Sequence, residues 1–307
     1  MTDTLSVALP VPVRAGKSDD PAEIIRFAAK ATRHGKAALA TLTEIRGGAA
    51  RALGSHVAVS VTGEYCGYVS GGCVEAAVAT EALLAIEAGT DAVVTFGEGS
   101  PFFDIALPCG GGVTIAIHVL RDSDVLEDTL RHLSARKSVA LSYDPSSQTL
   151  EQSANLPSRS GWQKDRFLSV YRPRTGLVVS GQTVEAEAVN RLAEASGFDV
   201  QLVSSPKDIE LMKIDPFTAV VLLHHDLDLE MDLLDRALAS PAFYIGALGS
   251  TRTHRRRVER LHSAGVPSKC YDRIRAPIGL FGPTRDATSL ALSVLADIAA
   301  ARLEVFA

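Results

Sequence analysis

Two cysteines in this sequence stand beside glycines, in a context that suits ligand binding better than core packing. Cys73 follows Gly71 and Gly72 at a point where a strand-like run gives way to a helical one. Glycines allow the backbone to turn tightly and leave amide N–H groups open to a ligand. The start of a helix also lowers the pKa of a nearby thiol and favours the thiolate. Cys109 is followed by glycines as well, so we expect both thiols to face one pocket.

A free cysteine can also behave as a small buried hydrophobe, and this is the alternative interpretation of both thiols. The neighbouring glycines favour function, because a core position needs no open backbone. The other two cysteines are interpreted as a structural residue on a strand, Cys66, and a loop residue without a partner, Cys270. No C-x-x-C pair is present, so the sequence predicts reduced thiols rather than a disulfide framework or a structural zinc site.

A second group of polar residues follows a strand nearer the C-terminus. Gly249 and Ser250 come directly before a predicted helix, and Arg252 lies in its first turn. Amide groups at a helix start, a hydroxyl and a guanidinium together suit a phosphate. The alternative is that the arginines form a solvated helix face, as we expect of Arg256 and Arg257.

His225 and Asp226 follow a buried-looking strand at its carboxyl end, where the ligand sites of parallel sheets collect. They could act as an acid–base pair or position a ligand. Equally, Asp226 could cap a helix while the histidine bonds to backbone. The sequence leaves both interpretations open.

The first turn of the C-terminal half lacks the glycine pattern that binds dinucleotides. That fingerprint is G-x-G-x-x-G/A, with an acidic residue at the end of the next strand. Here Thr183 stands where the second glycine would be, and Ser204 and Ser205 end the next strand without a carboxylate. The sequence therefore argues against NAD(P) binding.

The order of the expected elements places these motifs at strand ends in an α/β fold. Helical and strand-like runs alternate, with turn residues between them. We expect an α/β domain over residues 1–150 that begins with a loose arm (1–18), a polar linker over 151–172, and a second domain over 173–307. Regular strand–helix alternation in the second domain predicts a Rossmann-like, doubly wound parallel sheet.

The composition is typical of a soluble globular protein, since 46% of the 307 residues are hydrophobic and the net charge is −5. An acidic chain of this kind is a poor candidate for general binding to nucleic acid or to a membrane surface. The sequence shows no leader and no apolar run of about 18 residues, so we expect it in the cytoplasm.

Several motifs, taken in order, resemble one known family. They are the strand Ala38–Thr41, the loop with Gly47, Arg51 and Gly54, the stretches 70–75 and 107–111, the pair His225–Asp226, the stretch 243–250, and Pro277–Leu280. Over nearly the full length they resemble the xanthine dehydrogenase accessory proteins of the XdhC/CoxI family. The chain departs from that family at Thr183 and Ser204, where a glycine and an acidic residue are common. It also departs at Gly48, which replaces a common serine.

The resemblance implies an N-terminal XdhC/CoxI domain, a C-terminal Rossmann-like domain, and a non-catalytic chaperone that binds molybdenum cofactor. It implies sulfuration of the cofactor with a cysteine desulfurase, insertion into a xanthine dehydrogenase-type apo-enzyme, and a homodimer. Cys73 and Cys109 would contact or shield the molybdenum. Arg51, Ser250 and Arg252 would face the anionic end. The cofactor-binding residues expected on this basis are Arg51, Ser70, Gly71, Gly72, Cys73, Glu75, Cys109, Gly110, Gly111, His225, Asp226, Gly249, Ser250 and Arg252.

Two kinds of enzyme are the alternatives. A nucleotide- or NAD(P)-dependent oxidoreductase would use the Rossmann-like domain, but it needs the glycine fingerprint that Thr183 breaks. A nucleotidyltransferase acting on the cofactor would need a transferase motif, and the sequence shows none. The chaperone interpretation is therefore preferred.

Overall fold

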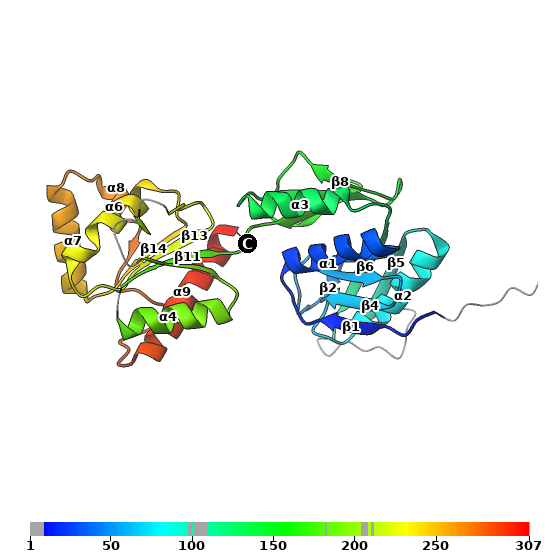
Figure 1. Ribbon diagram of the computed structural model, residues 1–307, viewed down its shortest axis with the longest axis horizontal. Helices are drawn as coiled ribbons and strands as arrows, with labels where there is room; N and C mark the ends of the chain where they lie inside the picture. The colour runs from blue at the N-terminus through cyan, green and yellow to red at the C-terminus, as the bar shows by residue number, and fades with distance from the viewer. Residues whose placement is uncertain are drawn as a thin grey trace, which may run out of the picture. The chain divides into compact units, whose positions relative to one another are not determined.

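The computed structural model describes residues 9–97, 100, 110–181, 183–203, 208–209 and 212–306 (Figure 1). The chain divides into two compact units, Met1–Arg172 and Pro173–Ala307. Each unit has its own central sheet and its own apolar cores. No helix within the described residues combines the length and the apolar character needed to cross a membrane.

A six-stranded sheet with the order β1-β4-β3-β2-β6-β5 forms the centre of the first unit. β1 and β4 run parallel, and the other neighbours are antiparallel. The strands are β1 (Val13–Gly16), β2 (Ala37–Arg46), β3 (His56–Ser60), β4 (Glu64–Gly67), β5 (Ala92–Gly97) and β6 (Gly112–Leu120). The pairing of β1 corrects the expectation of a loose arm over 1–18, because hydrogen bonds to β4 hold residues 13–16 in the sheet.

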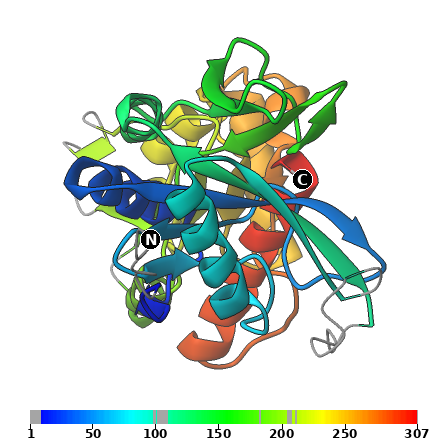
Figure 2. The same ribbon diagram turned by 90° about the vertical axis from the view of Figure 1, so that its right-hand side faces the viewer.

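Helices cover both faces of this sheet (Figure 2). Side chains alternate along a strand, so Ala38 of β2 packs into one core with α2 (Glu75–Ala88), while Leu39 packs into another with α1 (Pro21–His34). α3 (Asp124–Ser134) lies against α1 in the second of these cores. The segment that links β4 to α2 therefore leaves a well-packed strand and enters a well-packed helix.

A four-stranded antiparallel sheet with the order β8-β7-β10-β9 completes the first unit. Its strands are β7 (Val139–Asp144), β8 (Thr149–Ser153), β9 (Gly161–Gln163) and β10 (Arg166–Tyr171). β8, β9 and β10 occupy much of the stretch expected as a linker, residues 151–172, so the linker expectation is wrong. The polar residues that suggested it lie mostly in the turns between these strands, whereas Phe167 is fully buried in a small core with Tyr143 and Ala116.

A five-stranded parallel sheet with the order β12-β11-β13-β14-β15 forms the second unit, which confirms the predicted Rossmann-like, doubly wound fold. Its strands are β11 (Gly176–Ser180), β12 (Asp199–Val203), β13 (Thr218–Leu222), β14 (Tyr244–Ala247) and β15 (Ile274–Arg275). Its helices include α4 (Val184–Ala195), η1 (Leu227–Leu229), α6 (Met231–Ala239), α7 (Thr251–Ser263), α8 (Ser268–Tyr271) and α9 (Ala287–Phe306). α4 and α9 pack on one face of the sheet, and α6 and α7 on the other. The strand order reverses between β11 and β13, and ligands of such sheets commonly bind at the carboxyl ends there.

Candidate functional site

The turn between β4 and α2 is held from within by two polar side chains, Ser70 and Glu75. The Glu75 carboxylate is fully buried, and its Oε1 accepts hydrogen bonds from the amides of Val69 (3.1 Å) and Ser70 (2.8 Å). The Ser70 hydroxyl lies within donating distance of both carboxylate oxygens, at 2.9 Å from Oε1 and 3.0 Å from Oε2. A buried carboxylate needs such partners to offset its lost hydration. Glu75 therefore shapes the turn and does not lie on its surface.

The next amide groups point at Ser70 and not at solvent. Its Oγ accepts from the amides of Gly72 (3.2 Å), Cys73 (3.1 Å) and Val74 (3.4 Å). This corrects the expectation that the glycines leave these amides open to a ligand. A hydroxyl oxygen offers two lone pairs, so three amides compete for one acceptor. The turn thus satisfies much of its own backbone, and contact with a ligand is left mainly to side chains.

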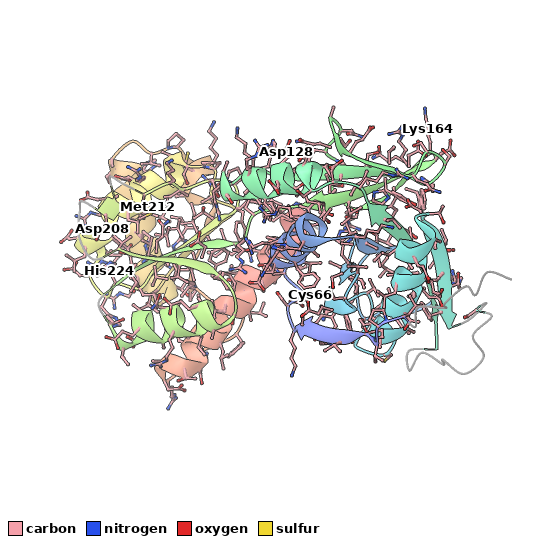
Figure 3. The ribbon with its side chains drawn as sticks, turned by 45° about the vertical axis from the view of Figure 1, so that its right-hand side comes forward. Cys66, Asp128, Lys164, Asp208, Met212 and His224 are labelled. Carbon is pink, nitrogen blue, oxygen red and sulfur yellow. The ribbon has the colours of Figure 1, made fainter. Side chains whose placement is uncertain are left out.

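Cys73 is the thiol that this turn presents to solvent. The residue is exposed and stands one position before Val74, the N-cap of α2. Gly72 has a φ of +110°, and a Cβ there would meet nothing within 4 Å, so the space beside the turn is open. Cys66, in contrast, is buried on β4 as expected (Figure 3), and burial raises the pKa of its thiol. Of the two cysteines, Cys73 is the accessible one.

The loop that follows β2 lies against two other backbone segments. A Cβ added at Gly111 would lie 2.3 Å from the carbonyl oxygen of Arg46 and 2.8 Å from that of Gly48. A Cβ added at Gly71 would lie 3.7 Å from the Cβ of Ala50, further along the same loop. The predicted residues Gly71 and Gly111 are therefore neighbours of one loop, although 40 positions of sequence separate them.

Cys109 lies outside the described residues, so a pocket shared by the two thiols stays a prediction. Its neighbour Gly110 is exposed, and a Cβ there would again meet nothing within 4 Å. Gly110 is thus open to solvent, as Gly72 is, whereas Gly111 is buried against the loop after β2.

Arg51 joins the loop after β2 to the Cys73 turn. Its Nε donates to the carbonyl oxygen of Ser70 (3.3 Å), and its Nη1 forms an ion pair with Asp19 Oδ2 (2.7 Å). The guanidinium carbon lies 5.2 Å from the ring centroid of Tyr68. The structure therefore brings the predicted residues Arg51 and Ser70 into direct contact.

Arg14 also lies beside the Cys73 turn, and it is not among the site residues expected from the sequence. Its Nη1 donates to the carbonyl oxygen of Gly67 (3.2 Å), and its guanidinium carbon lies 4.8 Å and 4.4 Å from the ring centroids of Tyr65 and Tyr68. Cation–π contacts of this kind hold a guanidinium flat against a ring. β1 has four residues, too few to show the alternation of a strand, and the sequence marks it only by Pro12 before it and by Gly16 at its end.

The predicted anion residues of the second unit lie at the start of α7. Ser250 is exposed and is the N-cap, with its Oγ accepting from the amide of Thr253 (3.2 Å). Gly249 has a φ of +124°, and a Cβ there would lie 2.8 Å from the Thr253 side chain, which explains why glycine stands in this turn. Arg252 is exposed in the first turn of the helix. These three residues are close in sequence and on one helix end, as predicted.

His225 and Asp226 are both exposed at the carboxyl end of β13. Asp226 caps the short helix η1, because its Oδ1 accepts from the amide of Asp228 (3.0 Å). The capping interpretation of Asp226 thus has direct structural support. The histidine that bridges strands is its neighbour His224 (Figure 3), whose Nε2 lies 2.7 Å from the Oγ of Ser180 at the end of β11. Burial lowers the pKa of His224.

Arg257 corrects the expectation of a solvated arginine face on α7. Arg256 is exposed as expected, but the Arg257 side chain is fully buried. It forms an ion pair with the equally buried Glu230 and donates from Nη2 to the carbonyl oxygen of Leu248 (2.9 Å). A run of arginines does not reveal which one lies on the inner face of the helix, and the buried acid partner is distant in sequence.

The first turn of the second unit packs tightly against β13. A Cβ added at Gly181 would lie 2.8 Å from the carbonyl oxygen of Leu223. Thr183 is the N-cap of α4, and its Oγ1 accepts from the amide of Ala186 (3.3 Å). Ser204 and Ser205 lie outside the described residues. The absence of an NAD(P) site stays a prediction.

Two further observations concern other candidate sites. A pocket of about 320 Å³ in the first unit is lined by Thr43, Val93 and Trp162 among others, and none of the predicted site residues borders it. Within the residues that the structure describes, no three His, Cys, Asp or Glu side chains are grouped so as to hold a metal ion.

Two family models match this chain: the XdhC and CoxI family over residues 31–97, and the XdhC Rossmann domain over residues 177–298. The Molybdenum cofactor insertion chaperone PaoD of Escherichia coli (strain K12) is 47% identical over 295 residues, which cover 95% of this chain and 92% of that protein. The chain belongs to the XdhC and CoxI family. The first match includes Arg51 and the Cys73 turn, and the second includes His225 and Ser250.

The fold of this family member also matches a solved structure. A crystal structure described as a xanthine dehydrogenase from Bacillus halodurans has a TM-score of 0.74 and 19% sequence identity, and the match covers 93% of this chain and 96% of that one. At this level of identity the similarity shows the fold alone.

Proposed function

We propose that this chain binds molybdenum cofactor as cargo, supports its sulfuration by a cysteine desulfurase, and inserts it into a xanthine dehydrogenase-type apo-enzyme. The proposal is supported by 47% identity to a protein named as a molybdenum cofactor insertion chaperone. The structural observation that carries it is the exposed Cys73 thiol on an internally bonded turn beside Arg51. We further propose a non-catalytic role, a homodimer and a cytoplasmic location.

The side chains around Cys73 suit this cargo. The metal of the cofactor is held by a dithiolene, and a thiolate is the kind of soft ligand that can approach such a centre. The cofactor also carries a phosphate, which a guanidinium binds through charge-assisted hydrogen bonds. Cys73 supplies the thiol and Arg51 the guanidinium, while the open space beside Gly72 leaves room for a bound molecule.

In this proposal the residues of the first unit divide into two groups. Cys73, together with Cys109 in the neighbouring segment, contacts or shields the molybdenum. Ser70 and Glu75 keep the turn in place, because their hydrogen bonds fix the backbone on both sides of the thiol. The glycines of both segments keep the backbone free of side chains that would fill the site.

We propose a second, smaller contribution from the second unit. The exposed Ser250 and Arg252 at the start of α7 would bind an anionic group. His225 would position that group from the neighbouring strand end, since it is exposed beside the cap residue Asp226.

The proposed binding is tested by titrating molybdenum cofactor into the purified chain. We expect one cofactor per chain for the wild type, and binding at least about tenfold weaker for Cys73→Ala, the effect of losing a contact worth about 1.4 kcal/mol. Cys109→Ala is expected to weaken binding as well, whereas Cys270→Ala serves as the matched control. Absence of binding by the wild type would contradict the function, and unchanged binding by Cys73→Ala would remove that thiol from the site.

The proposed insertion step has a separate test. The cofactor-loaded chain is mixed with a xanthine dehydrogenase-type apo-enzyme, with and without prior incubation with a cysteine desulfurase and cysteine. We expect activity to appear after the incubation and to depend on the chain. Equal activation by free cofactor would show that the chain is not required for insertion.

A further inference from the structure

β1 lies beside the Cys73 turn because it pairs with β4, the strand that leads into the turn. Arg14 stands opposite Tyr65 in this parallel pair, and the turn begins directly after β4 ends. The Arg14 guanidinium reaches the carbonyl oxygen of Gly67, the last residue of β4. Arg14 of β1 therefore places a positive charge where the chain enters the turn.

Arg14 and Arg51 contact the same aromatic ring. Their guanidinium carbons lie 4.4 Å and 5.2 Å from the ring centroid of Tyr68. A ring face holds a guanidinium in place without using its N–H groups. Two positive charges beside one ring attract an anion, and an anion bound there lowers their mutual repulsion. The geometry therefore favours an anionic ligand.

Most donors of the two guanidinium groups are free for such a ligand. Each guanidinium carries five N–H donors. Among the described residues, Arg14 donates from Nη1 alone, and Arg51 donates from Nε to Ser70 and from Nη1 to Asp19. Neither arginine is fully buried, so the remaining donors can reach a bound molecule.

Asp19 occupies part of this arrangement. Its side chain is 66% exposed and that of Arg51 is 32% exposed, and the pair is joined at 2.7 Å. An exposed ion pair contributes little stability, so an incoming oxyanion can replace the Asp19 carboxylate at small cost. A phosphate is the better partner for Arg51, because a planar guanidinium binds two of its oxygens at once.

We propose that Arg14 and Arg51 form the receptor for the phosphate of the cofactor, and that Asp19 occupies the Arg51 site until the cofactor binds. This inference rests on the proposed function and deepens it by assigning the phosphate to two arginines and a tyrosine. Arg51 contacts the carbonyl oxygen of Ser70, three residues before Cys73. The two arginines, which bind a hard anion, and the soft Cys73 thiol therefore lie at the same turn. The cofactor requires both, because its two ends are chemically different.

The experiment compares cofactor titrations of single variants of the full chain. Arg14→Gln and Arg51→Gln are each expected to weaken binding about ten- to a hundredfold, because each removes charge-assisted hydrogen bonds. Arg131→Gln makes the same charge change on the exposed surface of α3 and is expected to bind as the wild type does. Asp19→Asn removes the competing carboxylate and is expected to tighten binding about two- to fivefold. Arg14→Lys and Arg51→Lys keep the charge and should fall between Gln and wild type, because lysine cannot bind bidentately.

The outcomes separate this inference from the function on which it rests. Wild-type affinity in both Gln variants would overturn the receptor and leave the proposed function standing. An equal loss of affinity in Arg131→Gln would show that binding depends on the net charge of the chain and not on these two arginines, which would also overturn the receptor. Weaker binding by Asp19→Asn would contradict the role of Asp19. If a Gln variant does not fold, the Lys variant at the same position is used instead. Wild-type affinity in that Lys variant would overturn the bidentate contact. No binding by the wild type would overturn the proposed function and this inference together.

Discussion

Two glycine turns, one in each unit, lead from a strand into a helix, and they expose different chemistry. After β4, Ser70 and Glu75 bond the backbone from within, and the side chain left outside is the Cys73 thiol. After β14, Ser250 caps α7 through the amide of Thr253, and the exposed groups are a hydroxyl and the guanidinium of Arg252. One turn offers a soft nucleophile and the other offers groups that bind a hard anion.

Buried polar residues also serve different purposes in the two units. In the first, Glu75 is buried in order to hold a turn that faces solvent. In the second, buried Arg257 joins α7 to Glu230 at the start of α6 and to the carbonyl oxygen of Leu248 just after β14. A glycine turn at a strand end therefore predicts a ligand site only when the side chains around it point outward.

The largest effect is expected where the second unit buries charge. Arg257→Met leaves Glu230 buried without its partner, so we expect the free energy of unfolding to fall by about 3–5 kcal/mol. The double variant Arg257→Met/Glu230→Leu should recover most of that loss, since no charge then remains buried. Urea unfolding followed by circular dichroism measures both. Fluorescence of Trp162, the single tryptophan, reports unfolding of the first unit. The urea midpoint measured by this fluorescence should change less than the midpoint measured by circular dichroism. A loss below about 1 kcal/mol in the single variant would contradict the account.

The first unit should be the more sensitive to acid because of His56. This histidine is buried between Thr41 and Tyr171, with Nδ1 3.0 Å from the threonine Oγ1 and Nε2 2.7 Å from the tyrosine hydroxyl. Burial lowers the pKa of His56 from 6.5 to about 4. The unfolded chain takes up a proton below pH 6.5 while the folded chain does not, so stability falls as the pH drops from about 6.5 to about 4. The pKa difference corresponds to about 3 kcal/mol.

His56→Gln removes the titrating group, and its free energy of unfolding should therefore depend less steeply on pH across that window than that of the wild type. His34→Gln, at an exposed histidine near the end of α1, is the control. Equal pH dependence in the wild type and in His56→Gln would show that burial of His56 is not the cause.

The smallest expected effect is the difference in stability loss between alanine substitutions of two serines, one in each turn. Ser70→Ala removes a donor to buried Glu75 and the acceptor of three amides, so we expect a loss of about 2 kcal/mol. Ser250→Ala removes one cap at an exposed helix end and should cost about 1 kcal/mol. Urea denaturation measures both. Equal costs would mean that the two turns are not built differently.

The fold was predictable where apolar residues recur with a clear period. The parallel sheet of the second unit follows from strands such as Thr218–Leu222, which are buried along their whole length and alternate with helices. β1 and β9 escaped prediction because they have four and three residues, too few to show alternation. β8 is rich in polar residues and has no buried residue, which resembles the composition of a linker.

The candidate site was predictable in its location more than in its contacts. Glycines and a cysteine at a helix start identified the Cys73 turn, but nothing local shows that Ser70 would turn inward and accept its amides. An acidic residue is favourable at a helix start whether it faces solvent or the turn, so Glu75 gave no sign of its burial. Arg14 joins the cluster through a strand pairing across about fifty residues, which no sequence window contains.

The most direct test of the central claim measures whether bound cofactor covers Cys73. The full chain is alkylated with and without a saturating amount of molybdenum cofactor, and the modified peptides are quantified by mass spectrometry over time. We predict that the rate at Cys73 falls at least about tenfold, as expected when a ligand occupies an exposed thiol most of the time, while the rate at Cys270 stays the same. An unchanged rate at Cys73 under conditions where the cofactor is bound would contradict the account.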